Sequence, residues 1–374
     1  MDKMYVEDCC QILDSMRVPI TASDRKEGEY PYYGANGIQD YVADYIFDDE
    51  LVLLAEDGGN FGSKERPIAY RVSGKCWVNN HAHVLKPKEG LDVDYLCYSL
   101  MFYNVDGMVN GATRKKLTQA AMRKMQIPSR SMEEQKFIVD ELNRIIKIKE
   151  QRQQELQLLD NLIKARFVEM FGDPFGNPKG WRRLTFKEAG ERLSDGPFGS
   201  NLKSEHYTDR GIRVIRLGNI GVGRFIDDDK SYISPEHYER LKKYTCKSGE
   251  IIIGTLGEPN LRACIVPEVV GVAINKADCV HYIPKSEILN NDFVCQYINC
   301  PETLLLAKGM IHGQTRSRVS SGQIAQMPIF VPPIDLQRDF SEFMSQTDKS
   351  KVAVQKALDE AQQLFDSLMQ EYFG

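Results

Sequence analysis

The sequence predicts an α+β protein with two mixed α/β domains, each followed by a long α-helix, and the two helices paired as an antiparallel coiled coil. Three observations predict this fold class. The chain has 374 residues, which exceeds one ordinary domain. Residues 108–172 are repeated at residues 310–374, and each copy contains an uninterrupted heptad pattern. The chain is therefore expected to be a duplication of a domain-plus-helix unit.

A shift of 202 residues (310 minus 108) aligns the two copies without a gap over 65 positions. MVNGATRKKLT falls on MIHGQTRSRVS, and both copies end on Phe-Gly. The segments before the copies match only loosely, although residues 48–59 and 248–259 each contain an apolar run typical of a buried strand. Each half is therefore a divergent globular part followed by a well-matched tail.

Both tails have the pattern of long helices. Seam positions recur at alternating spacings of four and three, and neither tail contains Gly or Pro before its closing Gly. Each helix is expected to span about 35 residues, or about 50 Å at 1.5 Å per residue. The matched register favours pairing of the helices over separate packing of each on its own domain. The expected seam comprises Ile138, Leu142, Ile145, Leu156, Leu159, Ile163, Phe340, Met344, Val354, Leu358, Phe365 and Leu368.

The stretch GDPFGNPKGW, residues 172–181, separates the two halves. Its two prolines and three glycines are expected to end a helix. The predicted parts are a first domain, a helix, a linker, a second domain and a second helix, at residues 1–130, 131–172, 173–182, 183–331 and 332–374.

Composition narrows the function classes. The net charge of −5 and the sequence pI of about 5.8 are not the usual footprint of a nucleic-acid binder. The basic residues are clustered, however: six and no acid lie in 108–130, and four arginines and no acid lie in 210–226. The nine cysteines show no C-x2-C pair. No apolar run is long enough to span a bilayer, and the N-terminus lacks the pattern of a signal peptide. We therefore expect a cytoplasmic protein with free thiols, and neither secretion nor a zinc finger.

Two related globular parts joined by paired helices suit the reading of two sites along one linear polymer, as DNA-binding dimers read half-sites. Because the parts differ, the target is expected to be asymmetric, with the helices setting the gap. The Gly-led turns are expected to contact phosphates, and the Arg213 region to reach base edges. No metal site is expected, because His81 and His83 lack a third ligand of suitable spacing. The candidate DNA-binding residues are Tyr33, Asn36, Lys64, His81, Thr113, Arg114, Lys115, Lys116, Lys203, Arg213, Arg216, Asn219, Thr315, Arg316 and Arg318.

Catalysis by this chain is not expected. The sequence contains no P-loop, and its only Pro-Pro pair, Pro332-Pro333, lacks the flanks of the base-holding motif of amino-methyltransferases. Two alternatives stay open. A coiled-coil scaffold that does not read DNA is favoured by the acidic total charge, and a nuclease or methyltransferase in its own right is disfavoured by the missing motifs.

Residues 30–62 resemble the opening of a target recognition domain, and residues 198–220 resemble the opening of another from a different subclass. Residues 127–142 and 329–344 resemble a Pro-rich turn that leads into a helix with a Gln-basic pair, although Ser129-Arg130-Ser131 replaces the prolines in the first copy. This pattern is similar to the DNA specificity subunits of type I restriction–modification systems.

The resemblance implies two target recognition domains, no catalytic activity in this chain, and double-stranded DNA as ligand. It also implies two modification (methyltransferase) subunits and restriction (translocase/endonuclease) subunits as partners. S-adenosylmethionine, ATP and Mg²⁺ are expected in those partners, and no cofactor or metal in this chain.

Overall fold

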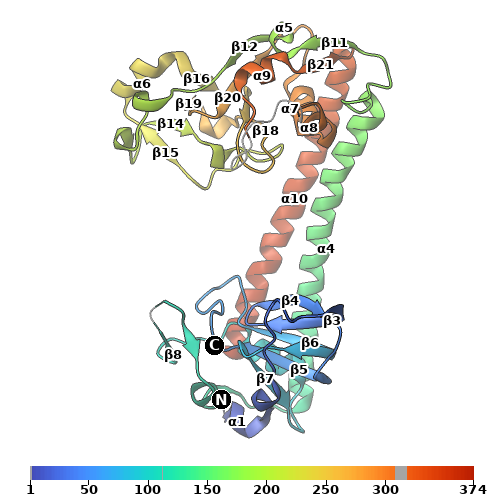
Figure 1. Ribbon diagram of the computed structural model, residues 1–374, viewed down its shortest axis with the longest axis vertical. Helices are drawn as coiled ribbons and strands as arrows, with labels where there is room; N and C mark the ends of the chain where they lie inside the picture. Colours follow the sequence, from blue (N-terminus) through green and yellow to red (C-terminus); the bar gives the residue numbers. More distant parts are fainter. Residues whose placement is uncertain (1, 112, 308–317) are drawn as a thin grey trace. The chain divides into compact units, whose positions relative to one another are not determined.

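The computed structural model describes residues 2–111, 113–307 and 318–374. The chain forms two compact units, and many of their elements are labelled in Figure 1. Unit 1 comprises residues 1–153 and 356–374, and unit 2 comprises residues 154–355. Each unit therefore contains one globular domain and a segment of each long helix.

The core of unit 1 is a six-stranded sheet. Its strands are β2 (Cys10–Ile12), β3 (Glu27–Gly34), β4 (Gly37–Val42), β5 (Phe47–Ala55), β6 (Ala69–Val78) and β7 (Ala82–Pro87). Their order is β2-β7-β5-β6-β3-β4, in which only the β3–β6 pair is parallel. Side chains of β5 alternate between two apolar clusters, with Val52 and Leu54 in one and Leu51 and Leu53 in the other. The sheet is therefore buried on both faces at its centre.

Helix α2 (Val93–Met101) packs on this sheet and begins where Asp92 accepts hydrogen bonds from two backbone amides of its first turn. The other short strands and α-helices of unit 1 lie at the N-terminus and within the basic segment, residues 108–130. They are β1 (Lys3–Tyr5), α1 (Val6–Cys9), β8 (Val109–Asn110), β9 (Lys116–Leu117), α3 (Gln119–Arg123) and β10 (Gln126–Pro128). Strand β1 pairs antiparallel with β10, and β8 pairs with β9. The basic segment thus lies on a hairpin and a short helix.

Unit 2 contains two larger sheets. The first has the order β12-β20-β17-β18, with strands β12 (Gly190–Ser194), β17 (Ile251–Gly254), β18 (Arg262–Ile265) and β20 (Cys279–Pro284). The second has the order β13-β15-β14-β19-β16, with strands β13 (Tyr207–Thr208), β14 (Ile212–Ile215), β15 (Ser231–Ile233), β16 (Thr245–Lys247) and β19 (Val272–Asn275). The buried strands predicted within 48–59 and 248–259 are thus β5 and β17.

The helices of unit 2 and its third, two-stranded sheet complete the domain. Strand β11 (Arg182–Thr185) pairs antiparallel with β21 (Pro328–Val331). The helices are α5 (Phe186–Ala189), α6 (Pro235–Leu241), α7 (Asn291–Asn299), α8 (Pro301–Ala307) and α9 (Ser321–Gln326).

The two units share a framework that reflects the sequence repeat. The order β2-β7-β5-β6 in unit 1 corresponds to β12-β20-β17-β18 in unit 2, and the β1–β10 pair corresponds to β11–β21. The side-chain oxygen of Gln135 accepts a hydrogen bond from the backbone amide of Asp92, the N-cap residue of α2. The side-chain oxygen of Gln337 accepts the equivalent bond from Asn290, the N-cap residue of α7. The strands that each unit adds to this shared framework differ. Unit 1 adds β3 and β4, and unit 2 adds the whole five-stranded sheet.

The two long helices, α4 (Met132–Phe171) and α10 (Ile334–Phe373), contain 40 residues each, more than the 35 predicted. At the start of α4, Ser131 and Glu134 bond reciprocally, and the Glu134 carboxylate accepts from the Ser131 amide at 2.9 Å. None of the helices in the described parts of the chain combines the length and apolar character that a membrane span requires.

The helices pair antiparallel within each unit. In unit 1 the first half of α4 meets the last part of α10, where Lys149 lies 4.9 Å from the ring centre of Phe365. In unit 2 the last part of α4 meets the first half of α10, where the Phe167 and Phe340 rings are 5.5 Å apart and Lys351 pairs with Asp160 at 2.9 Å. The predicted antiparallel pairing is therefore confirmed.

The predicted seam residues are all buried or half-buried. Ile138, Leu142 and Ile145 also belong to the apolar cluster of the unit 1 sheet, and Ile163 and Phe340 belong to the cluster of unit 2. The helices thus pack on each other and on the globular domains at once. Buried seam residues are Ile138, Leu142, Ile145, Ile163, Phe340, Val354 and Phe365, and half-buried ones are Leu156, Leu159, Met344, Leu358 and Leu368.

Candidate nucleic-acid interface

The basic turn of unit 1 lies between β8 and β9. It begins at Gly111, whose φ of +99° and close approach to the Arg114 carbonyl leave no room for a side chain. Thr113, Arg114, Lys115 and Lys116 are exposed. The Gly-led turn predicted from the sequence therefore presents a hydroxyl and three cations to solvent, which suits contact with a polyanion.

Three other segments converge on this turn. His81 precedes β7, Asp57 follows β5, and Asn36 lies in the turn between β3 and β4. One oxygen of Asp57 lies 2.7 Å from Arg114 Nη2 and 2.6 Å from His81 Nδ1. The Asn36 amide donates to the carbonyl of Gly58 at 3.0 Å. The structure therefore brings the predicted residues Asn36, His81 and Arg114 into one exposed cluster, with Asp57 at its centre.

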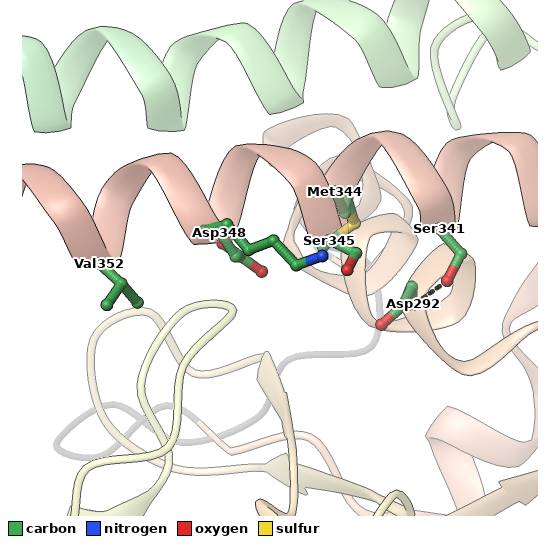
Figure 2. Close-up of a pocket in the computed structure, with 7 residues that line it drawn as sticks. Asp292, Ser341, Met344, Ser345, Asp348 and Val352 are labelled. Carbon is green, nitrogen blue, oxygen red and sulfur yellow. Dashed lines mark hydrogen bonds between the residues drawn. The ribbon is translucent and has the colours of Figure 1, made fainter.

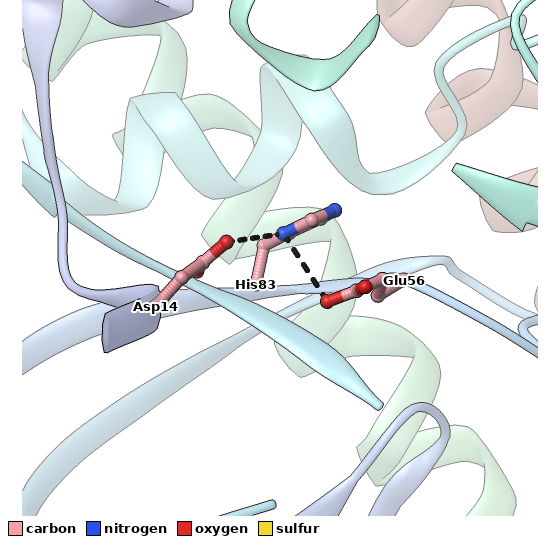
Figure 3. A group of neighbouring side chains, drawn as sticks. All are labelled: Asp14, Glu56 and His83. Carbon is pink, nitrogen blue, oxygen red and sulfur yellow. Dashed lines mark hydrogen bonds and ion pairs between the residues drawn. The ribbon is translucent and has the colours of Figure 1, made fainter. Parts of the chain in front are cut away.

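A buried ion-pair network includes Asp14, Glu56 and His83 (Figure 3). The carboxylate of Asp14 is 2.7 Å from His83 Nδ1, and Glu56 Oε2 is 3.7 Å from the same nitrogen. Arg17 and Lys116 pair with Glu56 at 2.6 and 2.9 Å. The network therefore ties the basic turn to the sheet through Lys116.

The pKa values in this network reflect the pairing. Burial alone raises the pKa of the Asp14 carboxyl, but the hydrogen bond and charge of His83 lower it below its ordinary value. Burial likewise raises the pKa of Glu56, and the hydrogen bonds from Arg17 and Lys116 lower it. Both carboxylates are thus held ionised as the anionic half of the network.

The oxygen and nitrogen atoms of Asp14, Glu56 and His83 lie within 4.8 Å of one another, a spacing that a metal ion could use. Two cationic side chains already pair with Glu56, and the second ring nitrogen of His83 lies 2.9 Å from the carbonyl of Leu117. A metal ion would have to displace these partners and would be repelled by the two cations. We therefore interpret the group as a structural ion-pair network.

Two further predicted residues of unit 1 lie elsewhere. Tyr33 is half-buried, with its ring 5.8 Å from that of Tyr70, and burial raises its pKa. Lys64 lines a different hollow, together with Lys3 and Phe102. Tyr33 therefore packs within the sheet, and Lys64 lines a hollow that none of the residues of the cluster lines.

Unit 2 repeats the backbone of this arrangement. In unit 1 the Glu56 amide donates to the His81 carbonyl at 2.8 Å, and the Leu117 amide donates to the Glu56 carbonyl at 2.7 Å. In unit 2 the amides of Thr255 and Val319 make the equivalent bonds, to the carbonyls of Asp278 and Thr255, at 3.0 and 3.1 Å. The same hydrogen-bond pattern thus holds the end of each basic turn against its sheet.

The side chains around the second turn differ from those around the first. Arg318 occupies the position that matches Lys116, and it pairs with Asp278 at 2.9 Å with its side chain 42% exposed. The predicted residues Thr315 and Arg316 lie outside the described residues. Of the DNA-binding residues predicted in this turn, Arg318 is the one that lies within the described residues.

The Arg213 region is not the exposed surface that the sequence predicts. Arg213 is 5% exposed, and its guanidinium bonds Asp227 at 2.7 Å. Asn219 is fully buried, and its side chain bonds the backbone of Arg216, Ile226 and Asp229. These two residues hold a loop in place, and their burial disfavours direct contact with a base edge.

Two other predicted cations of unit 2 are exposed. Arg216 pairs with Asp229 at 2.8 Å, with its side chain 40% exposed. Lys203 lies 3.5 Å from Glu205, with its side chain 53% exposed. Both stay candidates for contact with DNA.

A groove in unit 2 between α7 and α10 does not qualify as a DNA site (Figure 2). Its lining includes the carboxylates of Asp292 and Asp348, and Ser341 donates a hydrogen bond to Asp292. Burial raises the pKa of Asp292. The two carboxylates disfavour a phosphate, although Lys349 also lines the groove.

Sequence reasoning missed Asp57, Asp14 and Glu56, because basic and amide side chains are the types expected at a DNA surface. The signal available was the EDGG stretch, residues 56–59, directly after a predicted strand. His83, for which the sequence predicts no metal ligation, lies buried in β7.

Comparisons with known proteins show what the chain is similar to. The family described as the type I restriction modification DNA specificity domain matches residues 1–158. A putative type I restriction enzyme specificity subunit of Haemophilus influenzae is 26% identical over 354 residues, which cover 89% of this chain and 83% of that protein. The type I restriction enzyme MjaVIII specificity subunit of Methanocaldococcus jannaschii is 18% identical over 94% of this chain and 88% of its own.

Two solved structures share the fold. The S subunit of a type I restriction-modification system from M. genitalium has a TM-score of 0.57 at 15% identity, covering 100% of this chain and 96% of its own. A structure from work on complex assembly and conformational transition of the type I R-M system has a TM-score of 0.58 at 14% identity, with coverage of 100% and 97%.

The match to the type I restriction modification DNA specificity domain thus covers the first globular domain and the first part of α4. The relatives align over most of the chain, including unit 2. The chain is similar over most of its length to DNA specificity subunits of type I restriction–modification systems.

Proposed function

We propose that each unit reads one half of an asymmetric, bipartite DNA site. The observation that carries this proposal is the repeated backbone pattern around the two basic turns, combined with different side chains on it. Equal frameworks present equivalent surfaces to the same polymer, whereas different side chains select different base pairs.

The paired helices α4 and α10 set the gap between the half-sites and dock two modification (methyltransferase) subunits. One heptad adds about 10 Å of helix at 1.5 Å per residue, which corresponds to about 3 base pairs at 3.4 Å each. Insertion of one heptad at equivalent positions of both helices is therefore expected to lengthen the preferred gap by about 3 base pairs. An unchanged gap would contradict the role of the helices as a spacer.

The chain itself is noncatalytic, and methyl transfer, translocation and cleavage take place in the modification and restriction subunits. Those partners hold S-adenosylmethionine, ATP and Mg²⁺. The chain acts in the cytoplasm, which the nine free and buried thiols support, since such thiols persist in a reducing compartment.

The test is selection of random duplex DNA by the full chain assembled with its modification subunit, followed by sequencing. Two short, different motifs at a constant gap are the expected result. Binding without any enriched sequence would refute the proposal and favour a coiled-coil scaffold.

A further inference from the structure

The exposed cluster of unit 1 contains a carboxylate, which a surface that only binds phosphates does not need. Asp57 lies between Arg114 and His81, within 2.7 Å of a nitrogen of each. The Asp57 side chain is 19% exposed, whereas that of Arg114 is 59% exposed. A phosphate on Arg114 would therefore lie beside a second anion, whereas a neutral base edge would not.

The guanidinium of Arg114 is held in one orientation. Asp57 binds its Nη2 atom, and Gly58 lies against its Nε atom, where a side-chain Cβ on Gly58 would approach to 3.0 Å. Gly58 also has a φ of +63°, which favours glycine, and its amide donates to the carbonyl of Lys115 at 3.1 Å. The neighbouring Lys115 is exposed and makes no ion pair or side-chain hydrogen bond with any described residue.

This difference separates two kinds of DNA contact. A phosphate can be bound from many directions, and a mobile cation such as Lys115 suffices. Guanine presents its O6 and N7 acceptors side by side in the major groove, and arginine binds both when its planar group is aligned with them. A carboxylate that takes one edge of the guanidinium fixes its plane and leaves the other edge for the base.

We propose that Arg114 reads a guanine in the half-site contacted by unit 1, and that Asp57 is the positioning residue that orients it. The proposal rests on the proposed function, because it assigns a base to one of the two readers. It replaces the phosphate contact predicted for Arg114 from the sequence, and leaves that role to Lys115 and Thr113.

Four variants of the full chain, assembled with the modification subunit, test the proposal in the same random-duplex selection. Arg114→Lys keeps the charge and loses the paired donors. Discrimination for guanine at one position of one half-site is expected to fall by about 10- to 100-fold, with the other half-site unchanged. Asp57→Asn is expected to weaken discrimination at that same position.

Lys115→Gln is the matched control. It is expected to weaken binding equally for all sequences and to reduce the slope of log affinity against log salt by about 0.9, without a change in base preference. Thermal melting of each variant, compared with the parent chain, checks the fold. Arg114→Gln provides a second substitution at the same exposed position.

The outcomes separate the alternatives. If Arg114→Lys and Arg114→Gln both keep full discrimination at every position, Arg114 is a phosphate contact and the proposal fails. If Asp57→Asn tightens binding to all sequences and leaves discrimination intact, Asp57 only weakens nonspecific binding, and its positioning role is refuted. If the parent chain enriches no sequence, the proposed function fails and this assignment fails with it.

Discussion

Gln135 offers the sharpest test of how the helices are fixed to the domains. Its side chain is fully buried and makes three hydrogen bonds: it accepts from the Asp92 amide at 2.8 Å and donates to the carbonyls of Gly90 and Arg130 at 3.0 and 2.9 Å. Gln135→Met keeps a similar volume and removes all three bonds. One amide and two carbonyl groups then lose this partner at the start of α2 and of α4.

A net contribution of about 1 kcal/mol per hydrogen bond gives a loss of about 3 kcal/mol. Since 1.36 kcal/mol corresponds to a factor of ten, local opening around α2 becomes about 100-fold more frequent. Amide hydrogen exchange followed by mass spectrometry measures this opening peptide by peptide, and α2 is expected to exchange about 100-fold faster.

Gln337 is the matched control in unit 2. Its side chain accepts a hydrogen bond from the Asn290 amide and donates to the carbonyls of Ile288 and Pro332, as Gln135 does in unit 1. Gln337→Met is expected to speed exchange in α7 and to leave α2 unchanged. A change of less than about fivefold in α2 for Gln135→Met, about 1 kcal/mol, would refute the reasoning.

Three further predictions address stability and reactivity. Ser320→Ala removes the N-cap of α9 and is expected to lower its stability by about 1 kcal/mol, measured by hydrogen exchange, whereas Ser320→Gly should cost only a few tenths; equal losses would argue against the cap. The lowered pKa values of Asp14 and Glu56 stabilise the fold above their ordinary values of 3.8 and 4.5, and this stabilisation is lost as the pH falls below them. Asp14→Asn should therefore be less stable at neutral pH and lose less stability on acidification in urea unfolding, and an unaltered pH dependence would contradict the network. The hydrogen bond from Cys10 lowers the pKa of Cys9, so Cys9 is expected to react first with a thiol reagent at neutral pH, as peptide mapping can show; earlier modification of another cysteine would contradict this order.

The sequence was sufficient for the features that arise from local pattern. A heptad repeat and the absence of Gly and Pro predict two long helices, because both depend on residues within a few positions of one another. The gapless repeat predicts equivalent turns, and the conformation of Gly111 fits the turn expected there. The first helix is predicted from residue 131, and α4 begins at Met132, directly after the first residue of the Ser131–Glu134 pair.

The roles of single polar residues depended on the tertiary structure. Arg213 and Asn219 carry side chains that suit base readout, yet both are buried because a loop from 227 to 231 folds over them. The sequence gives no local sign of this burial. Arg216 lies three residues from each of them, and its side chain is 40% exposed.

The candidate interface itself was only partly predictable. Asn36, His81 and Arg114 could be named as polar candidates, but their convergence on Asp57 could not, since the four residues belong to segments far apart in the chain. Local periodicity determines which segments become helices or strands, because the backbone conformation of a segment depends on its near neighbours. The pairing of a carboxylate with a particular arginine is decided by strand order and turn geometry across the whole domain, and only the folded chain brings these groups within bonding distance.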